Sequence, residues 1–238
     1  MQMAEEGGIM ASWMVHFRIA DALLEQIAGL PQTEFIFGNI APDSGVPNKD
    51  WSVFTPSGDL SHFKTTDKEG MKDIHIDDYC AAYLKKEQYS CYSPRQKAFY
   101  LGYLTHLLTD MEWTEQIVRP SKDKFRELYE KDRKEWIWTL KGDWYDLDFL
   151  FLREHPEFRA FCLYEQATGF ENEFMDIFTR DAFDNRREYI CNFYRAGREG
   201  LDREYLYLTK TEMDCFVSES AAKLRMGLEK YWISEEGE

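Results

Sequence analysis

The segment LGYLTHLLTDMEW (residues 101–113) predicts a largely buried helix that nevertheless carries a histidine and an aspartate four positions apart. One face of this helix can be followed in steps of four and three residues through Phe99, Tyr103, His106, Asp110, Trp113 and Ile117. His106 and Asp110 lie one turn apart on that face, so their side chains reach the same point. An unpaired carboxylate in a protein core is costly, and Asp110 therefore needs a partner. A shared metal ion would provide one, and so would a buried His–Asp hydrogen bond or a wet cleft.

Most of the remaining chain is also patterned for helices. The segments with this pattern are residues 13–29, 76–87, 93–118, 123–138, 156–167, 171–197 and 211–231. KGDWYDLDFLF (141–151) is predicted to be an acidic-aromatic turn, and no segment alternates convincingly between apolar and polar residues. We therefore predict an all-α multi-helix bundle that forms a single domain over residues 12–238, with a flexible tail over residues 1–11.

Residues 41–76 are predicted to form a long loop, because this stretch is rich in proline, glycine and asparagine. Loops of more than about 12–15 residues are uncommon in compact domains unless they have a function. This loop contains Asp43 and His62, and both residue types bind metals.

The N-terminal helix supplies a further histidine. Its inward-facing row is predicted to be His16, Ala20, Leu23 and Ile27. Together with the residues above, the candidate ligands in chain order are His16, Asp43, His62, His106 and Asp110. These side chains could converge on one centre.

The composition limits the classes of function. Hydrophobic residues make up 44% of the 238 residues and aromatic residues 16%, which is too many for a disordered chain. The net charge of −15 disfavours extended binding to nucleic acid and to anionic membrane surfaces. It does not exclude a local metallic pocket that binds a phosphorylated small molecule or a lipid headgroup.

The sequence favours a cytoplasmic location. The five cysteines are odd in number and widely spaced, as expected for reduced thiols. The first residues are acidic where a signal peptide would be basic, and no apolar run is long enough to form an integral membrane segment. The sequence does not determine the oligomeric state.

Four short motifs together resemble the zinc-dependent phospholipase C family, whose fold is shared with P1-type nucleases. These motifs are WMVHFRIAD (13–21), FGNIAPD (37–43), SHF (61–63) and LGYLTHLLTDM (101–111). Their order and approximate spacing match over residues 12–113, whereas the C-terminal half is similar only in being helical. The resemblance implies a phospholipase C/P1 nuclease-like bundle that binds Zn²⁺.

The resemblance also implies a role for each candidate residue. Asp43, His62, His106 and Asp110 would surround one zinc ion, and Asp110 would bridge to a second ion that also binds His16. Asp43 would be the catalytic general base that activates the attacking water. We expect one or two ions, and Mn²⁺ or Fe²⁺ also suits such a His/Asp site.

The sequence departs from the family pattern after Asp110. Secreted members have another histidine shortly after this aspartate and then a His-x-x-x-Glu motif, but Gln116 stands at the first position and the motif is absent. Secreted members also use the free N-terminus as a ligand, whereas fifteen residues precede His16 here. Of the other histidines, His75 is predicted to be an ordinary loop residue and His155 a surface or N-cap residue.

We therefore expect a metal-dependent phosphoesterase that hydrolyses a phosphate ester or diester by metal-activated water. One alternative is a metal-binding regulatory or interaction module that has lost the chemistry, which the missing His-x-x-x-Glu motif favours. Another is a hydrolase of nucleotides or small phosphomonoesters. Sequence motifs of P-loop, Rossmann, HExxH and GxSxG proteins are absent.

Overall fold

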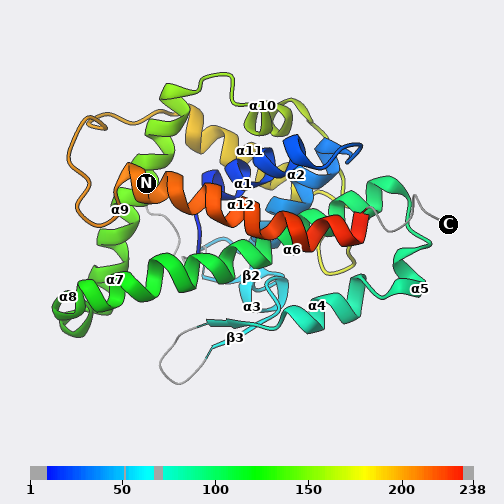
Figure 1. The fold of residues 1–238 in the computed structure, drawn as a ribbon, viewed down its shortest axis with the longest axis horizontal. Helices are drawn as coiled ribbons and strands as arrows, with labels where there is room; N and C mark the ends of the chain where they lie inside the picture. The colour runs from blue at the N-terminus through cyan, green and yellow to red at the C-terminus, as the bar shows by residue number, and fades with distance from the viewer. Residues whose placement is uncertain (1–9, 51, 67–71, 233–238) are drawn as a thin grey trace.

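The computed structural model describes residues 10–50, 52–66 and 72–232 and consists mainly of packed helices (Figure 1). The helices are α1 (Trp13–Gln26), α2 (Gln32–Ile40), η1 (Ala41–Asp43), α3 (Gly58–Ser61), α4 (Ile76–Tyr83), α5 (Lys86–Tyr89), α6 (Pro94–Trp113), η2 (Thr114–Val118), α7 (Arg119–Lys124), α8 (Arg126–Lys131), α9 (Arg133–Glu154), α10 (Arg159–Gln166), α11 (Ala182–Arg195) and α12 (Lys210–Trp232). The prediction of an all-α fold is confirmed. Most of the predicted tail, residues 1–9, lies outside the described residues.

The predicted loop over residues 41–76 contains local structure that the sequence did not indicate. Two short antiparallel pairs form there, β1 (Val46–Pro47) with β2 (Phe54–Thr55) and β3 (Lys64–Thr66) with β4 (Lys72–Ile74). Each strand has only two or three residues, which is too short for an alternating pattern to be recognised. Together with η1 and α3, these strands lie along one edge of the helical body (Figure 1).

Two glycines allow α2 and α6 to touch along their backbones. A Cβ atom at Gly102 would lie 2.1 Å from the carbonyl oxygen of Phe35, and one at Gly38 would lie 2.0 Å from that of Phe99. Any larger side chain would therefore force the two helices apart. This close packing brings the end of α2 beside the C-terminal half of α6, where His106 and Asp110 lie.

The prediction of a turn at residues 141–151 is wrong, because this segment lies inside α9. Its acidic side chains are buried, and Arg203 neutralises two of them. The Arg203 guanidinium lies 2.7 Å from Asp143 and 2.6 Å from Asp146. Ion pairing with a residue far along the chain thus lets acidic residues occupy a buried helix.

The predicted helix over residues 171–197 is also too long, since α11 begins only at Ala182. The side chain of Asn172 explains the difference. It donates to the carbonyl oxygens of Met175 and Phe178 and accepts from two backbone amides, so it stabilises a turn in place of a helix.

The C-terminal helix α12 packs against both α1 and α6 and closes the bundle (Figure 1). Trp113 at the end of α6 is fully buried and packs edge-on against Trp144 and Phe216. It therefore belongs to the core. Within the described residues, no helix combines the length and apolar character required to cross a lipid bilayer.

Candidate metal centre

The five candidate ligands come from four separate elements and meet in the interior. His16 lies in the first turn of α1, Asp43 ends η1, His62 caps the C-terminus of α3, and α6 carries both His106 and Asp110. Two overlapping groups have ligand atoms within 4.8 Å of one another: His16, His106 and Asp110 form one, and Asp43, His62 and His106 form the other. His106 belongs to both groups.

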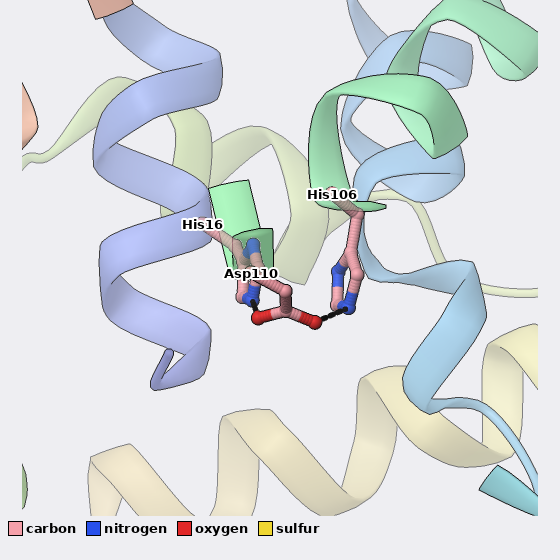
Figure 2. Close-up of side chains that lie close together, drawn as sticks. All are labelled: His16, His106 and Asp110. Carbon is pink, nitrogen blue, oxygen red and sulfur yellow. Dashed lines mark ion pairs between the residues drawn. The ribbon is translucent and has the colours of Figure 1, made fainter. Parts of the chain in front are cut away.

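The Asp110 carboxylate lies between two histidine rings (Figure 2). Its Oδ2 atom is 3.2 Å from His106 Nε2, and its Oδ1 atom is 3.4 Å from His16 Nε2. The rings of His16 and His106 are stacked with centroids 3.8 Å apart. The backbone N–H of Ala11 also donates to Oδ1, at 3.1 Å. Asp110 therefore offers one oxygen to each of two neighbouring positions for an ion, one beside His106 and one beside His16.

The protonation of His62 and His106 follows from their outer contacts. His106 Nδ1 lies 2.7 Å from the carbonyl oxygen of Asn39, and His62 Nδ1 lies 2.9 Å from that of Gly58. A carbonyl oxygen can only accept a hydrogen bond, so each Nδ1 carries the proton in the neutral ring. Both Nε2 atoms are then left with lone pairs that face the cluster.

These two lone pairs face each other across 3.2 Å, between His62 Nε2 and His106 Nε2. Asp110 Oδ2 is 3.9 Å from His62 Nε2, and Asp43 Oδ1 is 3.3 Å from the same atom. Four electron-rich atoms thus surround one position, and such a cluster repels itself unless a proton or a cation lies within it. The donor set of imidazole nitrogens and carboxylate oxygens is the one that Zn²⁺ binds.

Buried atoms without partners give a second, independent indication. Within the described part of the chain, neither ring nitrogen of His16 makes a hydrogen bond, and neither does Asp110 Oδ2. Both side chains are completely buried. Most buried polar atoms are satisfied in folded proteins, so these orphaned atoms fit a cation between them.

Asp43 is the ligand candidate that is open to solvent. Its side chain is 22% exposed, whereas that of His62 is 3% exposed. Ser44, the next residue, fixes the turn by donating its backbone N–H to Ala41 O at 2.9 Å. The cluster is therefore closed on the side of His16 and open on the side of Asp43.

The ionisation of the cluster without a metal is set by burial and by the close His–Asp contacts. Burial lowers the pKa of His16, and it lowers that of His62 to about 4. Burial opposes ionisation of Asp43 and Asp110, but the neighbouring histidines hold both carboxyl pKa values below the usual range. Against the effect of burial, the Asp110 carboxylate raises the pKa of His106. Both aspartates are thus anionic at neutral pH, and His16 and His62 are neutral, as ligands must be.

Two residues that support the ligands were not singled out from the sequence. Asn39, within the FGNIAPD motif, donates its side-chain amide to His16 O at 2.7 Å. Its backbone carbonyl oxygen orients His106. Tyr103 lies one turn before His106 and donates its hydroxyl to Ser61 O, next to His62. From the sequence alone, the position of Tyr103 on the same helix face as His106 could have indicated that it supports the ligands. The partners of Asn39 could not be inferred in this way, because they depend on helix packing.

The other polar residues considered from the sequence lie elsewhere. Gln116 bonds to Glu112 at 2.7 Å in the π-helical turn η2 and contributes nothing to the cluster. His75 precedes α4 and lies 2.9 Å from the Thr65 hydroxyl. His155 is exposed, but it follows α9 as a C-cap, so the predicted N-cap role is wrong.

Asp148 anchors the start of α1 and hence the helix that carries His16. Its carboxylate accepts from Ser12 Oγ at 2.8 Å and from the Tyr194 hydroxyl at 2.9 Å. Burial raises the pKa of Asp148 to about 7, although these hydrogen bonds oppose the shift.

This pKa predicts a pH dependence of stability. Between the unfolded value of 3.8 and the folded value of about 7, the folded state binds a proton that the unfolded state does not, so stability falls as pH rises. Asp148→Asn lacks this titration, so from about pH 4 to about pH 8 the unfolding free energy of the variant should gain about 4 kcal/mol relative to wild type. Urea unfolding of both proteins across this range measures the difference. A constant difference would contradict the prediction.

Comparison with known proteins gives one match. The family model described as zinc dependent phospholipase C matches residues 15–141, which is more than half of the chain and includes all five candidate ligands. No curated protein and no solved structure matches the chain.

Proposed function

Because the chain belongs to the zinc-dependent phospholipase C family, we propose that it is a metal-dependent phosphoesterase that hydrolyses a phosphate ester or diester with water. Asp43, His62, His106 and Asp110 would hold the first ion. Asp110 Oδ1 and His16 would hold a second one. Zinc is the metal that the family implies, and Mn²⁺ or Fe²⁺ suits the same donors.

The contact between the Nε2 atoms of His62 and His106 carries this proposal. They lie 3.2 Å apart, and each ring is turned inward by a carbonyl oxygen behind it. A purely structural His–Asp pair needs one histidine and one carboxylate. Here three histidines and two carboxylates from separate elements converge, and such convergence supports a metal centre.

A bound zinc ion lowers the pKa of a coordinated water to about 7 and neutralises charge on phosphate oxygens. We assign Asp43 as the general base, because it is ionised and is the exposed member of the cluster. Its Oδ1 atom faces His62, which leaves Oδ2 to accept the proton from the attacking water.

For the substrate, we infer a phosphorylated small molecule or a phospholipid headgroup, in keeping with the family. A cytoplasmic location, which we infer from five cysteines that form no disulfide in the described part of the chain, favours a soluble nucleotide or phosphomonoester over a membrane lipid. The absence of the His-x-x-x-Glu motif favours a module that retains the metal without turnover. These alternatives predict different results when metal content and hydrolysis are measured on the same protein.

The chain purified without added metal is expected to contain one or two equivalents of transition metal by elemental analysis. It should hydrolyse at least one member of a panel of phosphatidyl lipids, nucleotides and a generic phosphodiester. Removal of the metal by a chelator should abolish hydrolysis, and Zn²⁺, Mn²⁺ or Fe²⁺ should restore it. Bound metal with no turnover on any substrate would favour the regulatory module, and a chain that binds no metal would overturn the proposal.

A further inference from the structure

The side chain of Asp43, the general base assigned above, does not hold itself in place. Among the described residues, its carboxylate makes one close polar contact, between Oδ1 and His62 Nε2 at 3.3 Å. That nitrogen carries a lone pair, because the proton of the neutral His62 ring is on Nδ1. Without a cation between them, a lone pair and a carboxylate oxygen repel each other. The position of Asp43 is therefore set by its backbone.

The backbone that follows Asp43 is confined on two sides. The next residue, Ser44, donates its N–H to Ala41 O at 2.9 Å, which closes the turn of η1. The chain then passes through Gly45, which is buried. A Cβ atom at Gly45 would lie 2.6 Å from Pro56 O, so the turn is pressed against the strand pair that follows. The chain has no room to move in that direction.

Arg186 attaches this turn to the C-terminal half of the chain. It lies on α11 and is 9% exposed, and its guanidinium donates to Gly45 O at 2.8 Å. A hydrogen bond from a charged donor is roughly twice as strong as one between neutral groups. The accepting carbonyl group is only two residues beyond Asp43, so this bond fixes the backbone that carries the carboxylate.

The guanidinium of Arg186 also lies against the helix that carries His16. Its Cζ atom is 5.9 Å from the centre of the Trp13 ring and 5.5 Å from that of the Tyr189 ring. Trp13 is the first residue of α1, three residues before His16, and its ring packs edge-on against Tyr189. A planar guanidinium between aromatic rings has a defined orientation. Arg186 thus connects the turn after Asp43 with the start of α1.

We propose that Arg186 is a positioning residue of the metal centre, which fixes Gly45 O and so holds Asp43 where its carboxylate serves as ligand and general base. Without the guanidinium, Gly45 O would lose this donor, and a buried carbonyl without a partner is costly. The turn would shift to find another donor, and the Asp43 carboxylate would shift with it. This inference rests on the proposed function. It gives a part in the site to a residue beyond 15–141, the range that the family model matches.

The test is a zinc titration of the full chain in competition with a chromophoric chelator, with urea unfolding measured on the same samples. Arg186→Met removes the guanidinium and keeps an unbranched apolar stem, whereas Arg186→Lys keeps a cation that can donate. Arg187→Met is the matched control. Arg187 is the next residue of the same helix, is 12% exposed and also donates to a backbone carbonyl oxygen, that of Glu165, at 3.2 Å.

We expect Arg186→Met to bind zinc on the order of 10-fold more weakly than wild type, as is typical when a group that orients a ligand is lost. Arg187→Met should bind zinc as wild type does, even if it is destabilised as much, and Arg186→Lys should lie between the two. In an Asp43→Asn background, Arg186→Met should cause no further loss, because its effect passes through Asp43.

Hydrolysis gives a second measurement on the same proteins. With zinc-saturated Arg186→Met and bis(p-nitrophenyl) phosphate, kcat should fall on the order of 10-fold, because the general base is misplaced. KM should change little, since no contact with the substrate is removed.

Wild-type zinc affinity in Arg186→Met would overturn the inference. An equal loss in Arg187→Met, or the same further loss in the Asp43→Asn background, would also overturn it, since Arg186 would then act through general stability or another ligand. If Arg186→Met does not fold, Arg186→Lys is compared with Arg187→Lys, and equal zinc affinity of these two would contradict the role of Arg186.

The proposed function fails in a different way. A zinc-bound wild type that hydrolyses no substrate would contradict the phosphoesterase, while the zinc affinities of the variants still decide whether Arg186 positions Asp43. A wild type that takes up no zinc would overturn both.

Discussion

Asp110→Ala is expected to remove the bound metal and to reduce phosphoesterase activity by far more than the 10- to 100-fold typical of outer-shell changes. Asp110 offers one oxygen to the position shared with His106 and the other to the position shared with His16. Its loss therefore weakens both positions at once. It also removes one of the two negative charges that favour a divalent cation at the centre.

Elemental analysis and hydrolysis assays on the purified variant measure these effects. Glu112→Ala is a matched control, because Glu112 lies on the same helix and pairs at the surface with Lys223. The control should keep wild-type metal content and activity. If Asp110→Ala also kept its metal, Asp110 and His106 would be a buried polar pair, and the family relationship would describe only ancestry.

Gly102→Ala is expected to lower the free energy of unfolding by about 3 kcal/mol or more, because overpacking against backbone cannot be relieved by a rotamer change. The added Cβ atom would lie 2.1 Å from Phe35 O and 2.8 Å from Asn39 N. Relief requires α2 to move away from α6. That movement would also withdraw the Asn39 carbonyl oxygen from His106, so metal affinity should fall together with stability.

Urea unfolding of the variant measures the stability change, and a zinc titration measures the affinity. Gly142→Ala provides the control, since Gly142 lies inside α9 and the added Cβ would meet no atom within 4 Å apart from its chain neighbours and the backbone of its own helix. Because alanine favours helix over glycine, this control should gain about 0.5–1 kcal/mol. Equal stability of Gly102→Ala and wild type would show that the helices are not in the close contact described.

The helices that follow from local pattern were predictable. The face of α6 depends only on residues three and four positions apart, so His106 and Asp110 could be placed one turn apart from the sequence alone. The start of α6 was equally local, because Ser93 and Gln96 form a capping box with Pro94 at the first turn. Thr209 and Glu212 do the same for α12.

Acidic segments could not be assigned from local pattern. Residues 141–151 have the composition of a turn, and they form a helix because Arg203, far along the chain, neutralises Asp143 and Asp146. Asp148 is buried in the same helix because Ser12 and Tyr194 donate to it. The sequence contains these partners but does not indicate which of them form pairs in the folded protein.

The sequence by itself determined the helical class, the family motifs and the identity of the five candidate ligands. Only the tertiary structure decided their arrangement: the stacking of His16 on His106, the inward rotation of His62, and the opening at Asp43. The physical reason is the range of the interactions. Helix periodicity is a property of neighbours along the chain, whereas the centre depends on the backbone contact of α2 with α6 and on hydrogen bonds between residues far apart in sequence.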